Sequence, residues 1–552
     1  MSYTPLQKFF RMLYPNRREI KHLYIFAVTS GLIALSLPLG IQSIINLIQG
    51  GEISASWILL VTIVILGFIF SGGLQVVQMK ITEDLQKDIF ARSAFEFVIR
   101  IPKIKMDVME RHYAPELMNR FFDTVIIQKG VAKILLEFTT AALQILFGLI
   151  LLSFYHSFFI VFSVLVIFIA FIIGNYIFKR GLNSSLNESK YKYQVAYWLE
   201  ELARTFTTFK LESSSPIPIR NADNLVMSYL TARNHHFRIL LRQYYLFIVF
   251  KVLVAAGFLI LGGILVFNQQ MNIGQFVAAE IIVLLIIQAS EKILLSLETV
   301  YDLLTSIEKI SQVTDLELEK TQEEIFIPSE LENGLSLEFR DVCFSYPDDS
   351  EDVIHNVSFL VNSNEKIGIS GNSGSGKKTL IKLLLGFFNI NKGTILYDKI
   401  RLDNYDINQL RMAISACFEE MKIFDGSFLE NITMGKELHQ NQVVEVLQIT
   451  GLYEVLMKYP EGLLTKIGPH GIRLPGSVIQ KLILARCLLK PARLYIIEDI
   501  LKNVDKEDRM IIFEKVFLFL KDKTVVLITK DKKLFSFTEK TLELIDGKIY
   551  NN

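Results

Sequence analysis

The chain has 552 residues, more than a single hydrophobic core usually organises, so we expect at least two domains. Hydrophobic residues account for 51% of the chain and 41 residues are phenylalanine, a composition that excludes an ordinary soluble protein and indicates long apolar segments. The 58 basic residues are balanced by 57 acidic ones, so the net charge gives no reason to expect a nucleic-acid partner.

Six apolar segments dominate the N-terminal part of the chain. Before them, residues 1–20 mix aromatic and basic side chains, as in a short helix that lies in the membrane interface. The six segments lie near residues 22–48, 56–79, 132–155, 158–178, 243–268 and 275–298. Each reaches roughly 20 residues, enough to cross about 30 Å of hydrocarbon. We therefore expect residues 1–319 to form an all-helical transmembrane domain in contact with the lipid membrane.

The connections between these segments differ in length and charge. Residues 80–131 and 179–242 are long and rich in Lys and Arg. The short connections, for example residues 49–55 and 269–274, contain neither residue type. By the positive-inside rule, we expect the N- and C-termini and both long connections in the cytoplasm. The helical periodicity of residues 81–90 indicates that the helices continue through the long connections, beyond the membrane.

Four ionisable residues fall within or near the ends of the apolar segments. Lys251 and Glu280 lie inside them, and Glu291 and Lys292 lie near the end of the sixth. Such a group marks either a functional site or a structural pair between helices. We favour a structural pair for Glu291 and Lys292 and leave both interpretations open for Lys251.

A polar stretch separates the apolar part from the rest of the chain. Residues 320–334 contain a proline and a glycine among polar residues and are predicted to be a linker. Over residues 335–552, short apolar runs alternate with helical patterns, which is typical of an α/β domain. The runs at residues 494–497 and 524–529 are predicted to be buried strands.

A glycine-rich loop follows the predicted strand at residues 365–370. The loop consists of Gly371, Asn372, Ser373, Gly374, Ser375, Gly376, Lys377, Lys378 and Thr379. Strand, loop and helix in this order are the context of a phosphate-binding loop, in which backbone N–H groups and the helix end bind an anion. Gly371, Gly376 and Lys377 fit the pattern. Lys378, however, stands where a Ser or Thr normally supplies a hydroxyl to Mg²⁺, and an ammonium group cannot ligate a metal.

Further motifs accompany this loop along the C-terminal part. They are Phe344-Ser345-Tyr346-Pro347, residues 423–432, residues 465–478, residues 480–486 and Asp505. Together with the six apolar segments, their order resembles a bacterial ABC exporter half-transporter over the whole chain: six membrane helices followed by one nucleotide-binding P-loop domain. The resemblance implies that the loop binds ATP and that Tyr346 stacks on the adenine.

The sequence departs from the family pattern at positions to which the resemblance assigns chemistry. The residues in question are Lys378 at the magnesium hydroxyl, Glu419 in the glutamine loop, Leu474, Pro475, Gly476, Ser477 and Val478 in the signature, Glu498 at the magnesium-side aspartate, Asp499 at the catalytic glutamate and Lys530 at the switch histidine. Asp499 is one methylene shorter than glutamate, and misplacing a reacting water by about an ångström costs on the order of 100-fold in rate. We therefore expect weak ATP binding, poor ATP hydrolysis by the chain alone and a doubtful Mg²⁺ site with Glu498 as its one candidate ligand.

The charges introduced at these positions have opposite signs. They would face one another in one pocket, with Lys377, Lys378 and Lys530 against Glu419, Glu498 and Asp499. Lys378 and Glu498 flank the place of the metal. We expect either weak nucleotide binding that barely depends on magnesium or an empty pocket closed by a direct ion pair between these two residues. The alternative is drift at a site that is no longer needed.

The resemblance also implies how the chain assembles. Such exporters work as dimers in the cytoplasmic (inner) membrane, because each nucleotide lies between the phosphate loop of one chain and the signature of the other. Loops near residues 106–119 and 205–214 would contact the cytoplasmic domains. The chain is then an exporter half, paired with itself or with a competent second half-transporter. The alternative is a non-hydrolysing scaffold or regulatory subunit of a larger export complex with a periplasmic adaptor protein. The sequence does not indicate the substrate.

Overall fold

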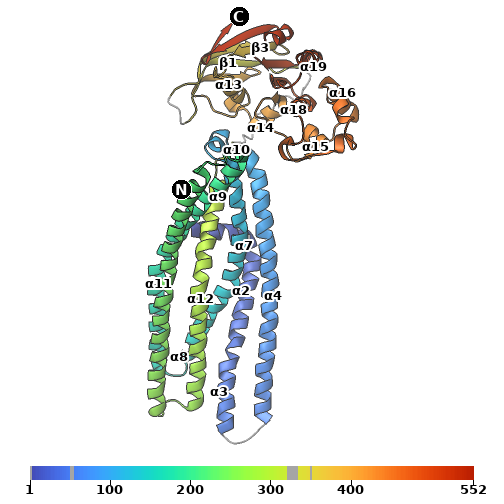
Figure 1. The fold of residues 1–552 in the computed structure, drawn as a ribbon. Coiled ribbons are helices and arrows are strands. Elements are labelled where there is room, and N and C mark those ends of the chain that lie inside the picture. The colour runs from blue at the N-terminus through green and yellow to red at the C-terminus, as the bar shows by residue number, and fades with distance from the viewer. Residues whose placement is uncertain (1–2, 50–54, 320–332, 348–350, 552) are drawn as a thin grey trace. The chain divides into compact units, whose positions relative to one another are not determined.

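The computed structural model divides into two compact units (Figure 1). The helical unit comprises Met1–Pro102 and His112–Leu316, and the α/β unit comprises Lys103–Arg111 and Glu317–Asn552. The structure describes residues 3–49, 55–319, 333–347 and 351–551. Most of the short connection expected at residues 49–55 and of the linker expected at residues 320–334 therefore lies outside the described residues.

The helical unit contains long helices joined by short turns. Its elements are α1 (Pro5–Leu13), η1 (Tyr14–Asn16), α2 (Arg17–Ala34), α3 (Ser36–Gln49), α4 (Ala55–Arg100), α6 (Ala114–Asn119), η3 (Arg120–Phe122), α7 (Asp123–Lys133), the π-helical turn η4 (Ile134–Phe138), α8 (Thr139–Ser153), α9 (Ser157–Arg204), α10 (Phe206–Leu211), α11 (Ile217–Phe267) and α12 (Ile273–Thr314). Within the described part of the chain, six helical runs are long and apolar enough to cross a membrane. At 1.5 Å per residue, the 51 residues of α11 extend roughly 75 Å, more than twice the hydrocarbon thickness. The helices thus continue well beyond their apolar segments.

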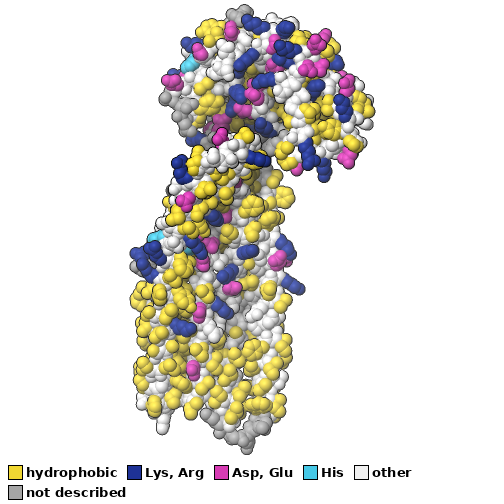
Figure 2. All heavy atoms as spheres, viewed as in Figure 1, with side chains coloured by type: hydrophobic (Ala, Val, Ile, Leu, Met, Phe, Trp, Pro, Cys, Tyr) yellow, Lys and Arg dark blue, Asp and Glu magenta, His cyan; other side chains and the backbone are white. Residues whose placement is uncertain are grey.

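Large hydrophobic side chains remain on the surface of these helices. Phe68 on α4 is 58% exposed and Phe171 on α9 is 69% exposed. On the face shown in Figure 2, hydrophobic side chains cover most of the half of the helical unit that holds α3 and α8. Because such a surface is unfavourable in water and favourable in lipid, the chain is a multi-pass membrane protein.

An ion pair joins the apolar stretches of α11 and α12. The Nζ atom of Lys251 on α11 lies 3.9 Å from Oε2 of Glu291 on α12. Glu291 is therefore in a pair between helices, and its partner is Lys251. This geometry supports the structural interpretation of both residues over a functional one.

Tyr301 lies at the junction of three long helices. Its side chain on α12 is fully buried, and its hydroxyl accepts a hydrogen bond of 2.9 Å from Nε2 of Gln243 on α11. Gly181 on α9 lies so close that an added Cβ would overlap the Tyr301 ring. The absence of a side chain at Gly181 is therefore what lets α9 pack against α12 here.

The α/β unit contains three sheets. Their strands are β1 (Leu337–Phe344), β2 (Ile354–Val361), β3 (Lys366–Gly371), β4 (Lys392–Tyr397), β5 (Ile400–Arg401), β6 (Ile414–Cys417), β7 (Gly426–Ser427), β8 (Lys466–Ile467), β9 (Leu494–Glu498), β10 (Thr524–Ile528), β11 (Lys540–Ile545) and β12 (Lys548–Asn551). The antiparallel sheet has the order β2-β1-β4-β5, and β7 pairs with β8. The six-stranded sheet has the order β12-β11-β3-β10-β9-β6 and is parallel apart from the β11–β12 pair.

Helices and turns connect these strands. They are η2 (Ile101–Lys103, at the boundary between the units), α5 (Met106–Glu110), α13 (Lys377–Leu384), η5 (Leu402–Asn404), α14 (Ile407–Ala413), α15 (Phe428–Thr433), α16 (Gln440–Ile449), α17 (Tyr453–Leu456), η6 (Gly462–Leu464), η7 (Pro469–Gly471), α18 (Gly476–Leu489), α19 (Lys506–Phe519) and η8 (Lys532–Phe537). The central strands β9 and β10 are buried along almost their whole length, as their continuous apolar runs predict for parallel strands covered on both faces. The expected fold class, a six-helix membrane domain followed by an α/β domain, is confirmed.

The parallel order of the six-stranded sheet positions the candidate site. Strands β3, β10 and β9 are neighbours, so their carboxyl ends meet at one edge of the sheet. The phosphate loop follows β3, Asp499 follows β9 and Thr529 follows β10. Ligands of open parallel sheets bind at this edge.

We predict that Gly181→Ala destabilises the helical unit, because the new methyl group overlaps the buried Tyr301 ring. Overpacking of this kind costs about 1–3 kcal/mol. Gly174→Ala on the same helix is the matched control, since no atom lies within 4 Å of its added Cβ. Thermal unfolding in nanodiscs should show a lower Tm for Gly181→Ala and an unchanged or higher Tm for Gly174→Ala. Equal Tm values for the two variants would contradict the packing described here.

Candidate functional site

The phosphate loop connects β3 to α13 and depends on two glycines. Gly374 has φ +82° and Gly376 has φ +98°, in the left-handed region that other residues rarely adopt. Gly376 also precedes the first turn of α13. The loop backbone therefore has the conformation that directs N–H groups toward an anion.

Lys377 is held by the loop itself. Its ammonium group donates hydrogen bonds to the carbonyl oxygens of Gly371, at 2.7 Å, and Asn372, and to Oγ of Ser375 at 3.3 Å. Burial lowers the pKa of Lys377, and the charge of Lys530 adds to this effect. The ammonium thus lies against the loop that would hold a phosphate.

Lys378 forms an ion pair with Glu419. The distance from Nζ to Oε2 is 3.1 Å, and the hydrogen bond to Glu419 raises the pKa of Lys378. Lys502 contacts the other carboxylate oxygen of Glu419 at 3.3 Å, and the two lysines, Lys378 first, lower the pKa of Glu419. Both side chains of the first pair are about half exposed, 54% and 51%, so it adds at most about 1 kcal/mol to stability. The pair matters because it holds the Lys378 ammonium and the Glu419 carboxylate beside the phosphate loop.

The expected pair between Lys378 and Glu498 is wrong. Glu498 instead accepts a hydrogen bond of 2.8 Å from the backbone N–H of Glu419. The cause is the position of Glu419, which follows β6 next to β9 and presents its N–H to Glu498 and its side chain to Lys378. Glu419 thus contacts Glu498 through its backbone and Lys378 through its carboxylate, and Lys378 is neutralised by Glu419 rather than by Glu498.

Asp499 is buried and engaged by residues that the sequence did not single out. One carboxylate oxygen accepts hydrogen bonds from Arg509 and, at 3.0 Å, from Oγ1 of Thr529. The other oxygen is buried without a hydrogen-bond partner among the described residues. Burial raises the pKa of Asp499, against the opposing effect of Arg509. Arg509 also pairs with Asp531 at 3.3 Å.

The six charged positions therefore divide into separate groups. Lys378 and Glu419 form one group with Lys502, whereas Asp499 forms another with Arg509. Lys530 is exposed, and no ion pair joins it to another described residue. The sequence held one pointer to Arg509. The residue lies in the first turn of α19, shortly after Asp505, which the resemblance had singled out.

Tyr346 lies beside the phosphate loop. Its hydroxyl is 3.0 Å from Oγ1 of Thr379, the last residue of the loop motif. The ring packs edge-on against Phe344 and Phe388, with centroid distances of 5.1 and 5.5 Å. The structure thus brings Tyr346 to the loop, with its hydroxyl tied to Thr379.

The signature-like segment Leu474, Pro475, Gly476, Ser477 and Val478 leads into α18. Pro475 stands at the N-cap of α18 and makes no side-chain hydrogen bond to the helix. Val478 is buried in the hydrophobic core around α18. Gly476 lies against Asn503, whose amide would collide with an added Cβ. Of these residues only Ser477 offers a hydroxyl group.

The segment Lys103–Arg111 packs onto the α/β unit close to α13. Ile104 forms a β-bridge with Leu318, and Glu110 accepts a hydrogen bond of 2.7 Å from Lys382 on α13. Lys382 also lies 3.4 Å from Glu420, the neighbour of Glu419. Residues 106–110 thus contact the domain as the resemblance implied, through a lysine one turn after Lys378.

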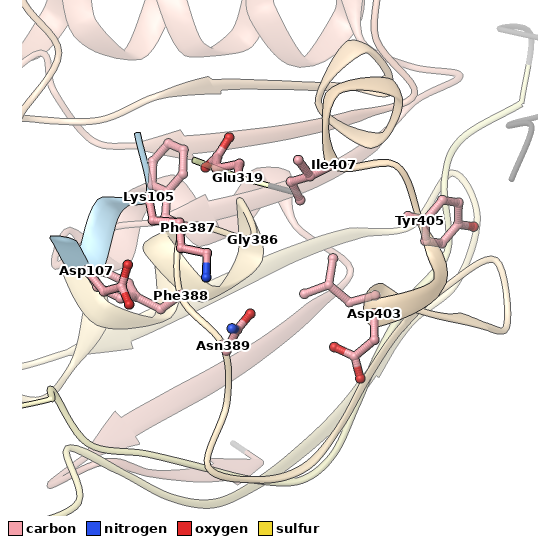
Figure 3. Close-up of a pocket in the computed structure, with 11 residues that line it drawn as sticks. Lys105, Asp107, Glu319, Gly386, Phe387, Phe388, Asn389, Asp403, Tyr405 and Ile407 are labelled. Atoms are coloured by element: carbon pink, nitrogen blue, oxygen red, sulfur yellow. The ribbon is translucent and has the colours of Figure 1, made fainter. Parts of the chain in front are cut away.

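A polar pocket of about 310 Å³ adjoins this segment (Figure 3). Lys105 and Asp107 line one side, while Asn389, Asp403 and Tyr405 come from the domain. The charged groups around it have partners: Lys105 pairs with Glu317 at 2.6 Å, and Glu319 pairs with Arg411 at 2.6 Å. The pocket is therefore a gap between packed segments of the α/β unit, and we assign it no ligand.

Comparisons with known proteins agree with this arrangement. The family model described as ABC transporter matches residues 354–501. The chain is 34% identical over 197 residues to a putative export ATP-binding/permease protein of Rickettsia bellii, an alignment that covers 36% of this chain and 34% of that protein. It is 30% identical over 248 residues to the ATP-dependent lipid A-core flippase of Xanthomonas campestris, covering 45% and 42%. It is 28% identical over 269 residues to the alpha-hemolysin translocation ATP-binding protein of Escherichia coli O157:H7, covering 49% and 38%.

These alignments span between about a third and two-fifths of the relatives' own length. The fold similarity extends further. A solved structure of a bacterial Atm1-family ABC exporter with ATP bound superposes with a TM-score of 0.86, covering 97% of this chain and 94% of that one at 16% identity. With an ABC transporter domain behind six long apolar helices, the chain has the domain order and the fold of an ABC exporter half-transporter.

Proposed function

We propose that the chain is an export subunit of the bacterial cytoplasmic membrane that works as a dimer, and that its own ATP site binds nucleotide weakly and hydrolyses it poorly. The observation that carries the second part is the Lys378–Glu419 ion pair. It puts a fixed positive charge where exporters use a metal ligand. The export function rests on the fold and on the names of the relatives.

The donor groups at the site do not fit Mg²⁺. A magnesium ion needs oxygen ligands in a near-octahedral arrangement. Lys378 supplies an ammonium group instead of a hydroxyl, and Glu419 is engaged by two lysines. Glu498 alone remains as a candidate ligand.

The two residues at the positions that would activate water, Asp499 and Lys530, are also poorly suited to do so. Asp499 is shorter than the glutamate it replaces and is bound to Arg509 and Thr529. One oxygen of Asp499 is occupied by these donors and the other is buried, so what limits Asp499 is its reach to the attacking water and not its pKa, which burial raises. Lys530 carries a positive charge and offers no acceptor in place of a neutral imidazole.

The partner chain is part of this proposal. In a dimer, the segment Leu474–Val478 would complete the partner's site, and Pro475 supplies no hydroxyl there. This favours, as a second candidate, a non-hydrolysing subunit that acts as a scaffold in a larger export complex with a periplasmic adaptor protein. The two candidates differ in what should co-purify with the chain. The first expects a competent second half-transporter, and the second expects a periplasmic adaptor protein.

The orientation is testable by cysteine labelling in intact cells. We place the α11–α12 turn outside the cytoplasm and the middle of α9 inside it, because basic residues concentrate near the latter. Gln270→Cys should react with a membrane-impermeant thiol reagent and Asn187→Cys should not. Cys343, Cys417 and Cys487 are buried, so the native background is low. Labelling of Asn187→Cys in intact cells would reverse the orientation.

ATP hydrolysis by the purified chain should be close to background. Asp499→Glu alone should not restore it, because Lys378 and Lys530 remain in place. The measurement is phosphate release in nanodiscs, with and without co-purifying subunits. A magnesium-dependent turnover of about 1 per second from the chain alone would refute the proposal.

Nucleotide binding should depend little on magnesium in the parent chain. Lys378→Ser restores a hydroxyl and removes one of the two lysine partners of Glu419, so binding of labelled ATP should become sensitive to EDTA. Lys502→Ser is the matched control, since it removes the other partner of Glu419 without changing the loop. Strong magnesium dependence in the parent, or equal dependence in both variants, would contradict the role given to Lys378.

A further inference from the structure

A cavity of about 600 Å³ lies within the helical unit. Its walls come from α6 and the turn after it, from the C-terminal half of α9 and from the last turns of α12. Basic and aromatic side chains are prominent in the lining: Arg120, Lys190, Lys309, Tyr193 and Tyr197. The cavity is large enough for a small organic molecule.

Lys309 is the most unusual of these residues. It is only 9% exposed, yet no hydrogen bond or ion pair joins it to another residue of the described chain. Its Nζ lies over the Tyr193 ring, 5.2 Å from the centroid. A cation–π contact contributes about 0.5–2 kcal/mol, less than the several kcal/mol that burial of an ammonium group costs. The charge of Lys309 is therefore incompletely compensated.

Two further donors border the same cavity. Nη2 of Arg120 bonds Glu116 at 3.2 Å, but Nε of Arg120 is buried and has no hydrogen-bond partner in the described structure. Lys190 on α9 is exposed and forms no ion pair with a described residue. Arg120, Lys190 and Lys309 thus each have hydrogen-bonding capacity left over.

The acidic side chains near the cavity are already engaged. Glu116 pairs with Arg120, and Glu308 pairs with Lys8 at 3.1 Å. Asp123, behind the cavity wall, accepts a hydrogen bond of 2.6 Å from the Tyr193 hydroxyl and lies 3.9 Å from Lys192. Lys8 also lies 3.2 Å from Asp315, so one cation is shared by two carboxylates. With these groups counted together, Lys190 and Lys309 leave a surplus of one positive charge.

We propose that this cavity binds a phosphate monoester group. Such a group carries about −1.5 to −2 charge at neutral pH and offers three acceptor oxygens. The local surplus of one positive charge favours an anion, Lys190 and Lys309 offer two ammonium groups to its oxygens, and Nε–H of Arg120 supplies a directional donor. Tyr193 and Tyr197 provide aromatic surface for the organic part of the ligand. The inference concerns the helical unit and does not depend on ATP hydrolysis.

The position along α12 favours a soluble ligand over a lipid headgroup. The sixth apolar segment ends near residue 298, and Lys309 follows 11 residues later. At 1.5 Å per residue this places Lys309 about 16 Å beyond the apolar segment, outside the hydrocarbon. The ligand we infer is therefore a water-soluble phosphorylated molecule.

The test uses the full chain in phosphatidylcholine nanodiscs, with inorganic phosphate as the probe at constant ionic strength. All samples carry Lys377→Met, so that phosphate held by the phosphate loop is not counted. Lys309→Met removes the buried charge at similar volume. Lys87→Met is the matched control, because Lys87 is an exposed lysine of the same unit, paired with Glu83 and Asp84. Binding of labelled phosphate and Tm are measured for each variant.

We expect Lys309→Met to weaken phosphate binding about 10–100-fold, the loss typical of one charged hydrogen-bonding group. Phosphate should raise the Tm of the parent and of Lys87→Met only. Without phosphate, Lys309→Met should unfold at the same or a higher temperature than the parent, because it removes an uncompensated buried charge. This last result separates a ligand-binding lysine from a merely structural one.

Equal phosphate binding by parent and Lys309→Met would overturn the proposal. So would a lower Tm of Lys309→Met without phosphate, combined with no effect of phosphate on any variant. A further arm replaces part of the phosphatidylcholine with phosphatidic acid. A Lys309-dependent rise in Tm with that lipid alone, and none with soluble phosphate, would overturn the assignment to a soluble ligand.

Discussion

The ion pair between Lys378 and Glu419 governs the arrangement of the candidate ATP site. It links the loop after β6 to the first turn of α13, while the place of that loop beside β9 presents the backbone N–H of Glu419 to Glu498. The Glu419 carboxylate lies against Lys378 and the Glu498 carboxylate accepts the backbone N–H of Glu419, so different donors hold the two carboxylates. The pair is half exposed and weak as a source of stability, so its effect on the chemistry is larger than its effect on folding.

A second lysine extends this electrostatic arrangement to the segment Lys103–Arg111. Lys382 lies on α13 one turn after Lys378 and contacts both Glu110 and Glu420. Adjacent glutamates, Glu419 and Glu420, are therefore held by lysines of the same helix. A change in the charge near the phosphate loop would act on both contacts, since α13 carries both cations.

The sequence was sufficient to predict the fold because the signals were long and redundant: six apolar segments, a glycine loop between a strand and a helix, and motifs in a fixed order. It also predicted that a carboxylate neutralises Lys378, but it named Glu498 where the structure has Glu419, because the choice depends on how β6 and β9 lie side by side and not on a local pattern. Arg509 was missed because its contact with Asp499 depends on the rotation of α19. The charge surplus at Lys309 arises from residues that α6, α9 and α12 bring together from distant parts of the sequence, so no local sequence pattern predicts it.

The contacts of Tyr301 limit how the helical unit can move. A slide of one turn displaces a helix by about 5.4 Å along its neighbour, which would separate the Tyr301 hydroxyl from Gln243 and leave both polar groups buried without partners. The missing side chain of Gly181 makes the fit on α9 equally close. A slide of one turn at this junction is therefore unfavourable for α9, α11 and α12 alike.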